Sequence, residues 1–101
     1  GAITNMTRCM ALDYASNGIR VNAVCPGMTR TEILENTFAC VRGAEEKFKE
    51  AYPVHYVAEA TQVADAVIFL ASRKVDYLNG INLPIDGGLT AHTGQPAMGV
   101  Y

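Results

Sequence analysis

The chain has 101 residues, which is enough for one small domain. Half of the residues are hydrophobic, 18% are charged and the formal net charge is -2, a balance typical of a packed globular segment and not of a disordered tail. Nucleic-acid and anionic-membrane surfaces need clustered Lys and Arg, and bilayer spans need long apolar runs, so this composition favours neither partner.

A helix is the first predicted element, over residues 1–16. Its larger apolar side chains recur at spacings of three and four, at Ile3, Met6, Met10 and Tyr14. Gly18 follows at a position where helix ends often take the left-handed conformation, so we expect the helix to end there.

Two strands are predicted, over residues 19–25 and 81–85. The first is short, apolar and closed by Pro26-Gly27, and the second runs from an Asn79-Gly80 turn to Asp86. Both are mostly apolar on both faces, as in parallel strands covered by helices. We therefore expect both to be buried on both faces and to need further neighbouring strands.

Helices are predicted between the two strands. Two polar ones cover residues 32–41 and 44–51, with Gly43 between them and Pro53 after them. A third, over 61–72, carries a wide apolar stripe that predicts deep burial, formed by Val63, Ala64, Val67, Ile68, Leu70 and Ala71. The tail over 89–101 shows no periodicity.

This order of elements predicts an α/β fold with two strands and about four helices. A strand, a helical crossover and another strand form a parallel unit. Because a doubly wound sheet has about six strands, we expect roughly 100 or more further residues upstream.

Three cysteines occur in the chain, at Cys9, Cys25 and Cys40. They are odd in number and form no Cys-x-x-Cys pair, so neither a disulfide framework nor a zinc site is predicted. We expect reduced thiols that pack as small hydrophobic side chains in a cytoplasmic protein.

Three short motifs occur together in this chain. Residues 18–31 read Gly-Ile-Arg-Val-Asn-Ala-Val-Cys-Pro-Gly-Met-Thr-Arg-Thr, 69–72 read Phe-Leu-Ala-Ser, and 85–88 read Ile-Asp-Gly-Gly. In their order and spacing they resemble the short-chain dehydrogenase/reductase family, from Gly1 to about Pro96. The resemblance implies that residues 1–101 are the carboxyl-terminal portion of a single NAD(P)-binding domain, a Rossmann-type doubly wound parallel sheet.

The resemblance also implies cofactor contacts after the first strand. Pro26 and Gly27 correspond to the segment that borders the nicotinamide, the backbone of Thr29 to the carboxamide contact and Thr31 to a hydroxyl contact. The family usually has Val or Ile where Thr29 stands, a change that a backbone contact tolerates. Pro-Gly after a strand is also an ordinary turn, and Thr is a favoured helix cap, so Thr31 has two compatible roles.

Residues 32–57 correspond to the family's substrate-binding loop. Within it, Ile33, Leu34 and Phe38 form either an apolar lid over the substrate or ordinary core contacts, and the sequence leaves both open. His55 and His92 are each either a solvated loop residue or a contact to the site. Asn22 is expected to be structural.

The resemblance implies that the whole protein transfers a hydride between NAD or NADP and a carbonyl or secondary alcohol. The Tyr-x-x-x-Lys and Gly-rich GxxxGxG motifs that this needs are absent from the 101 residues, so we assign no catalytic residue here and expect both motifs in an upstream segment. Family analogy implies a homotetramer, with interfaces on the first helix and on the later helix with the last strand. The alternatives are a truncated, non-catalytic chain that only binds or assembles, and a member of the family that has lost activity.

Overall fold

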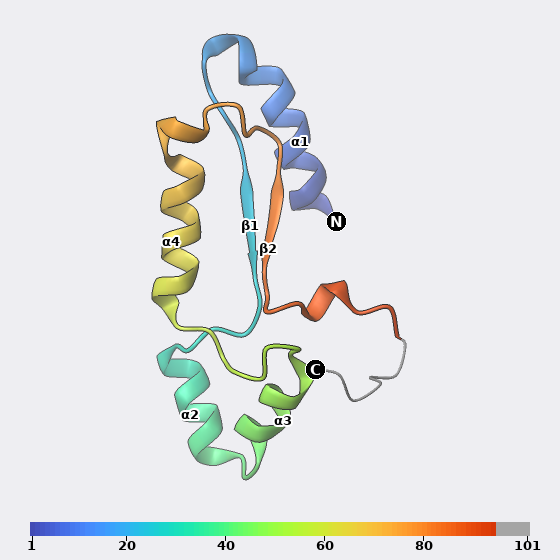
Figure 1. Ribbon diagram of the computed structural model, residues 1–101, viewed down its shortest axis with the longest axis vertical. Helices are drawn as coiled ribbons and strands as arrows, with labels where there is room; N and C mark the ends of the chain where they lie inside the picture. The colour runs from blue at the N-terminus through green and yellow to red at the C-terminus, as the bar shows by residue number, and fades with distance from the viewer. Residues whose placement is uncertain (95–101) are drawn as a thin grey trace.

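The computed structural model describes residues 1–94 and shows an α/β fold (Figure 1). The helices and strands are α1 (Ala2–Tyr14), β1 (Ala23–Pro26), α2 (Glu32–Cys40), α3 (Ala44–Ala51), α4 (Ala60–Ala71) and β2 (Asn82–Ile85). Single 3-10 turns lie at Ala15–Asn17, Arg73–Val75 and Leu89–Ala91. The predicted fold class and order of elements are confirmed. The predicted tail extends past residue 94 and so lies partly outside the described residues.

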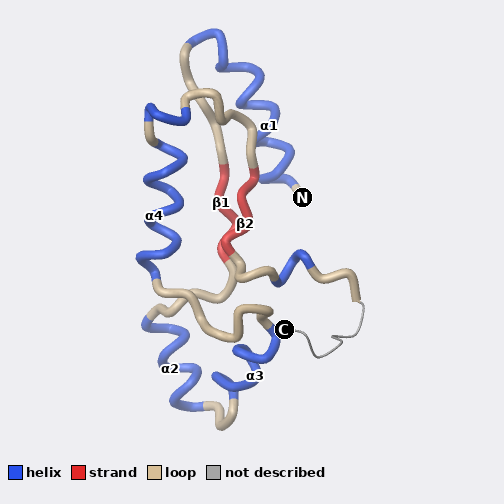
Figure 2. Tube along the Cα trace, in the orientation of Figure 1, coloured by secondary structure: helices blue, strands red, loops and turns tan. Residues whose placement is uncertain are grey.

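The two strands pair in parallel at the centre of the chain (Figure 2). The register runs from Ala23 opposite Asn82 to Pro26 opposite Ile85. β1 begins at Ala23 and not at Ile19 as predicted, because the residues before Ala23 form hydrogen bonds with side chains instead of with a neighbouring strand. Val21 N–H donates to the Asn79 side chain, and the Asn22 side-chain amide donates to Leu78 O, so Asn22 is structural as expected.

Arg20 lies in the segment before β1, and its side chain stabilises the carboxyl end of α4. Its guanidinium donates to the carbonyls of Leu70, Ser72 and Leu78 at 2.9, 3.2 and 3.0 Å. The last carbonyls of a helix have no partner within the helix, so a donor from elsewhere must satisfy them. One side chain thereby joins α4, the turn after it and the first strand.

Helix α1 packs on the sheet through small side chains. Its buried residues are Thr7 and Ala11, while the four larger apolar residues at helical spacing are all largely exposed. Gly80 explains the close approach, because a Cβ built there would lie 3.4 Å from the Ala11 Cβ. Asn79 adds a hydrogen bond to the Ala11 carbonyl at 3.0 Å. The predicted end of this helix is confirmed, with Gly18 left-handed at φ 76°.

Two burial predictions are wrong for the chain as described. In α4 only Leu70 is buried, and Ile68 is 67% exposed, because only one side of the helix contacts β1. The strands are half-buried instead of buried on both faces, and Cys25 and Pro26 of β1 are exposed. The only strand that β1 pairs with among residues 1–94 is β2, so its other edge is uncovered.

The cysteines also differ from the prediction. Cys9, Cys25 and Cys40 are free thiols, as expected, but all three are exposed and none packs as a core residue. Each lies on a face of α1, β1 or α2 that no other described segment covers. Burial of a small hydrophobic side chain requires a neighbouring element, and none is present at these faces.

Helices α2 and α3 lie beyond the carboxyl ends of both strands (Figure 1). Much of the buried apolar core belongs to this part, namely Leu34, Ala44, Tyr52 and Val57. Gly43, left-handed at φ 76°, begins α3, as the predicted break between the helices requires.

Candidate functional site

The carboxyl end of β1 is held tightly against β2. Gly27 N–H donates to Ile85 O at 3.0 Å and so continues the ladder beyond Pro26. A Cβ at Gly27 would lie 2.9 Å from Cε1 of Tyr52 and 3.0 Å from the Asp86 Cα. The family resemblance placed Gly27 in the segment that borders the nicotinamide, which is a flat ring. Within this chain the flat ring is Tyr52, and packing alone already requires glycine.

Tyr52 was not predicted to take part in the site. It is buried, and its hydroxyl accepts a hydrogen bond from Met28 N–H at 2.8 Å. The residue follows α3 immediately and precedes Pro53, which turns the chain back towards the strand ends. Tyr52 and Met28 are 24 positions apart and no periodic pattern links them, so only the tertiary structure shows this contact.

The backbone at Thr29 presents an open hydrogen-bonding edge. Thr29 and Ala58 form a parallel bridge in which Arg30 N–H donates to Ala58 O at 2.8 Å and Ala58 N–H donates to Met28 O at 3.3 Å. In a bridge of this kind the N–H and C=O of the central residue point to the opposite side. Within residues 1–94 neither group of Thr29 has a partner, so an N–H donor and a C=O acceptor stand side by side. The Thr29 hydroxyl donates to Gly27 O at 3.1 Å and thus turns back onto its own loop.

Thr31 begins α2. Its side-chain oxygen accepts from Leu34 N–H at 3.3 Å, so the expected role as a helix cap is confirmed. The hydroxyl proton is left free to donate to a further acceptor, since capping uses only a lone pair of the oxygen. Thr29 and Thr31 are thus both at the strand end, one with its backbone available and the other with its hydroxyl.

The three predicted substrate-loop residues divide into two kinds. Leu34 is buried, and Phe38 is half-buried with its ring centroid 5.8 Å from that of Phe48 in α3. Phe38 therefore packs between α2 and α3, and Leu34 is a core residue of α2. Ile33 is 80% exposed and is the member of the set that remains available to a ligand.

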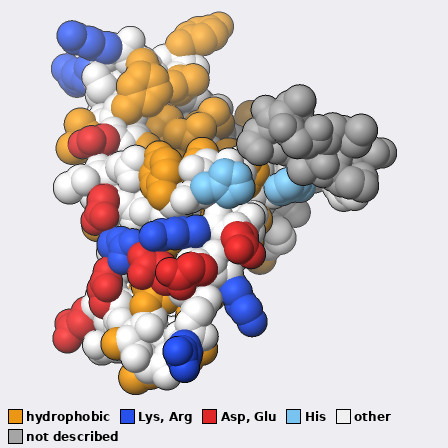
Figure 3. Space-filling model, turned by 60° about the horizontal axis from the view of Figure 1, so that its bottom comes forward, with side chains coloured by type: hydrophobic (Ala, Val, Ile, Leu, Met, Phe, Trp, Pro, Cys, Tyr) orange, Lys and Arg blue, Asp and Glu red, His pale blue; other side chains and the backbone are white. Residues whose placement is uncertain are grey.

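Arg30, between the two threonines, carries the densest charge network at the site. Its guanidinium contacts Glu35 at 2.7 Å, Glu45 at 2.5 Å and Glu59 at 3.5 Å, and Lys49 contacts Glu45 at 3.3 Å. Figure 3 shows acidic and basic side chains gathered over this end of the molecule. The hydrogen bond from Arg30 lowers the pKa of the Glu45 carboxyl, and those to Glu45 and Glu35 raise the pKa of the guanidinium further. No sequence motif predicted this network.

Asp86 closes β2 as a turn, as the sequence predicted. Its carboxylate accepts from Gly88 N–H at 3.1 Å, from Thr90 N–H at 3.0 Å and from the Thr90 hydroxyl at 2.6 Å. The Thr90 hydroxyl bond is the main cause of a lowered pKa for the Asp86 carboxyl. Gly87 and Gly88 follow with φ of 59° and 93°, values that favour glycine.

The two histidines are exposed. His55 has a left-handed φ of 59°, unusual for a residue other than glycine, and its Nδ1 lies 3.2 Å from Lys49 O. No contact of His92 with the candidate site is found among the described residues. Both histidines thus have the exposure of solvated loop residues.

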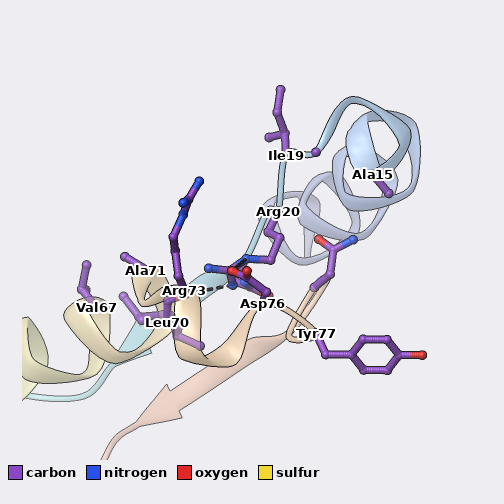
Figure 4. A pocket seen from close by; sticks show the side chains of 13 residues that line it. Ala15, Ile19, Arg20, Val67, Leu70, Ala71, Arg73, Asp76 and Tyr77 are labelled. Atoms are coloured by element: carbon purple, nitrogen blue, oxygen red, sulfur yellow. Dashed lines mark hydrogen bonds and ion pairs between the residues drawn. The ribbon is translucent and has the colours of Figure 1, made fainter.

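Among residues 1–94, one hollow lies at each end of the strands. The smaller, about 210 Å³, is at the strand ends and is lined by Met28, Tyr52, Asp86 and their neighbours. The larger, about 1080 Å³, is at the opposite end of the strands, where Arg20 faces Asp76 and Tyr77 points away (Figure 4). Arg20, which pairs with Asp76 at 3.6 Å, stabilises the end of α4 and so has a structural role in this hollow. We therefore interpret the hollow as an uncovered face of the fold and not as a ligand site.

Residues 1–94 contain neither a metal-binding cluster of side chains nor a membrane-spanning helix. No group of three or more His, Cys, Asp or Glu side chains there is arranged to hold a metal ion. None of the helices in this part of the chain combines the length and apolar character needed to cross a membrane. The strand end offers a hydrogen-bonding edge at Thr29, the hydroxyl of Thr31 and the exposed apolar side chain of Ile33.

Comparison with known proteins gives a consistent result. The model of a family described as enoyl-(acyl carrier protein) reductase matches residues 1–90. Meso-2,3-butanediol dehydrogenase from Serratia marcescens is 42% identical over 96 residues, which cover 95% of this chain and 37% of that enzyme. The chain thus spans little more than a third of the length of such relatives.

Solved structures agree in fold. A short chain dehydrogenase family protein from Francisella tularensis subsp. tularensis SCHU S4 matches with a TM-score of 0.83 and 37% identity over 91% of this chain and 41% of that one. A structure described as ElxO with NADP bound matches with a TM-score of 0.84 and 30% identity, covering 90% and 37%. Both are full folds that extend well beyond the region shared with this chain.

Proposed function

The chain belongs to the short-chain dehydrogenase/reductase family, and on this premise we propose that the complete protein is an NAD(P)-dependent oxidoreductase. It interconverts a carbonyl and a secondary alcohol by hydride transfer, and residues 1–101 supply the wall beside the nicotinamide and the substrate loop over 32–57. The observation that carries this proposal is the open N–H and C=O of Thr29 at the end of a parallel strand. Ligands of open parallel sheets bind beyond this end of the strands.

The residues present fit a nicotinamide. Its carboxamide has one N–H donor group and one C=O acceptor, which match the C=O and N–H of Thr29. Thr31 adds a hydroxyl with a free proton, and Pro26 and Gly27 form the adjacent wall. A related structure whose description names bound NADP supports cofactor use of this kind.

When bound, the nicotinamide gives or takes the hydride. The role of this chain is to hold the ring by its carboxamide so that one face is directed at the substrate. The backbone N–H and C=O of Thr29 would hold the carboxamide of the nicotinamide, and the Tyr52 hydroxyl fixes the backbone one residue earlier by accepting from Met28 N–H. The general acid and its lysine partner come from an upstream segment with Tyr-x-x-x-Lys, and the pyrophosphate cradle comes from GxxxGxG.

The substrate is a small-molecule alcohol or its carbonyl. One relative is named for a vicinal diol, which supports this class. Of the three side chains predicted to contact the substrate, Ile33 is the most exposed, whereas Leu34 is buried and Phe38 packs on Phe48.

The Thr29 contact is tested by substitution in the complete protein. Thr29→Pro removes the N–H, and the bridge to Ala58 survives because it uses Arg30 N–H and Met28 O. We expect the Kd of the reduced cofactor to rise at least about tenfold, the effect of losing one good hydrogen bond in a desolvated site. Thr29→Val keeps the backbone and is the matched control, with an expected change below about twofold. Equal Kd values for both variants would contradict the proposed contact.

Assembly is a second part of the proposal. The large exposed apolar residues of α1 and α4 are typical of surfaces that contact another segment or subunit. They include Ile3, Met6 and Leu12 on α1 and Val67, Ile68 and Phe69 on α4. We assign these two faces to the upstream segment and to a homotetramer in the cytoplasm, and sedimentation of the complete protein measures the oligomer.

A different class of function is favoured by one observation: the sequence of 101 residues contains no Tyr-x-x-x-Lys motif. On that reading the chain binds or assembles without catalysis, or belongs to a lineage that has lost activity. Intact-mass measurement decides the first case, since a protein of 10.9 kDa with no second polypeptide cannot complete the reaction. A panel of alcohols and carbonyls assayed by nicotinamide absorbance decides the second.

A further inference from the structure

The Arg30 network joins four parts of the chain at one side chain. Arg30 itself follows the open Thr29 edge, Glu35 belongs to α2, Glu45 to α3 and Glu59 caps the start of α4. Each guanidinium nitrogen has its own carboxylate, with Nη1 on Glu35, Nη2 on Glu45 and Nε on Glu59. Arginine alone among the basic residues offers three nitrogens in a fixed plane.

Burial separates this network from an ordinary surface ion pair. The Arg30 side chain is 26% exposed and that of Glu45 is 31% exposed, whereas Glu35 and Glu59 are more open. The guanidinium carbon also lies 5.9 Å from the Phe38 ring centroid, and that ring packs on Phe48 of α3. The charge is thus anchored on the apolar contact between α2 and α3, in addition to its carboxylate partners.

The backbone of Arg30 is fixed as firmly as its side chain. Its N–H donates to Ala58 O at 2.8 Å, next to the Glu59 cap of α4. A movement of the α2–α3 pair relative to α4 would therefore displace Arg30, and with it Thr29 and Thr31.

We propose that Arg30 is a positioning residue, whose contacts with Glu35, Glu45 and Glu59 hold the Thr29–Thr31 edge and the α2–α3 pair in the geometry that accepts the nicotinamide. This inference rests on the proposed function and adds a residue that acts on the cofactor through its neighbours without touching it. Its consequence is that cofactor affinity depends on an ion-pair network outside the contact surface.

The experiment uses the complete protein and the substitutions Arg30→Gln, Glu45→Gln and both together. Loss of the network is expected to raise the Kd of the reduced cofactor about tenfold, with kcat at saturation changed less than about twofold. The double variant is expected to match Arg30→Gln, because the other partner of Glu45, Lys49, belongs to the same helix α3 and does not link it to the Thr29–Thr31 edge. Arg73→Gln is the matched control, since Arg73 is exposed and makes no ion pair within residues 1–94.

Amide hydrogen exchange provides a readout independent of activity. In Arg30→Gln, exchange is expected to accelerate over residues 30–51 and to stay unchanged in α4. The inference is overturned if Kd and exchange match those of Arg73→Gln, or if exchange rises equally throughout the chain, which indicates general destabilisation. If Arg30→Gln does not fold, Arg30→Lys replaces it, and a wild-type Kd in that variant also overturns the inference.

Failure of the proposed function is recognised separately. If the wild-type protein binds neither NADH nor NADPH, the proposed nicotinamide site is rejected. The exchange measurement then still decides whether Arg30 holds α2 and α3, and unchanged exchange over residues 30–51 in Arg30→Gln rejects the positioning role as well.

Discussion

The strand-end region over residues 27–59 and the sheet region with α1 and α4 differ in how they are held together. In the strand-end region the contacts close within the chain: Leu34, Tyr52 and Val57 are buried, and the Arg30 network joins its helices. In the sheet region Ile68 of α4 and Leu12 of α1 are 67% and 80% exposed, and the described sheet has two strands. The comparison shows that contacts within the chain hold the strand-end region together, while the large apolar side chains of α1 and α4 stay exposed among residues 1–94.

The largest effect is expected from a substitution in the sheet region, which tests whether the exposed face of α4 is covered in the complete protein. Ile68→Asp places a charge on the exposed face of α4, which costs little if that face meets only water. If the face is covered in the complete protein, as we propose, the unpaired charge destabilises it by about 3 kcal/mol or more. Sedimentation and thermal unfolding of the complete protein measure this. A variant with unchanged assembly and Tm would show that the face is free.

Arg20→Met tests whether polar contacts compensate for the sparse apolar burial in the sheet region. The substitution keeps an apolar stem and leaves the carbonyls of Leu70, Ser72 and Leu78 without this donor. We expect a loss of roughly 2–3 kcal/mol in the free energy of unfolding, measured in urea. Arg73→Gln, on the neighbouring turn, is expected to change stability by less than about 0.5 kcal/mol. Similar values for both variants would contradict the role of Arg20.

Gly27→Ala tests the close packing of the strand-end region. The new methyl group would press on Tyr52 and on the Asp86 backbone at about 3 Å, so part of the loop must shift. We expect a loss of about 2 kcal/mol, as for other overpacked sites. Gly43→Ala meets open space and costs only its left-handed conformation, about 1 kcal/mol. If Gly43→Ala proved the more damaging, packing would not be the reason for Gly27.

Tyr52→Phe isolates the hydrogen bond from Met28 N–H. The ring stays in place, and the buried donor loses its acceptor, which costs about 1–1.5 kcal/mol. The Kd of the nicotinamide is expected to rise by a few-fold as well, because the neighbouring Thr29 edge loosens. Tyr56→Phe is the control, since the Tyr56 hydroxyl makes only a 3.5 Å contact with Gln62. An unchanged Tm in Tyr52→Phe would argue against the bond.

The smallest effect is the pH dependence contributed by Asp86. Its pKa is lowered in the folded protein, chiefly by the Thr90 hydroxyl, so the ionised form is favoured on folding. The contribution is fully present above the ordinary pKa of an Asp and is lost as the pH falls through the lowered folded value. Asp86→Asn is expected to flatten the acid limb of a Tm–pH curve. An unaltered limb would show that Asp86 does not contribute.

Local features were predictable because they depend on neighbouring residues. The second strand ended before Asp86 as expected, and the first ended one residue later than predicted, at Pro26. Gly18 and Gly43 bounded helices, and Thr31 capped α2. Each of these signals acts over a few residues through backbone conformation or one side-chain hydrogen bond. The family motifs also allowed the overall fold to be predicted, because their order along the chain implies a known arrangement of strands.

Contacts between distant residues were decided only by the tertiary structure. The Tyr52 hydroxyl meets Met28 across 24 positions, and Arg30 gathers Glu45 and Glu59, pairs that no spacing rule links. Burial was misjudged for the same reason. An apolar stripe such as that of α4 shows that a helix can be covered, but the neighbours that the chain actually brings to it determine how much of it is.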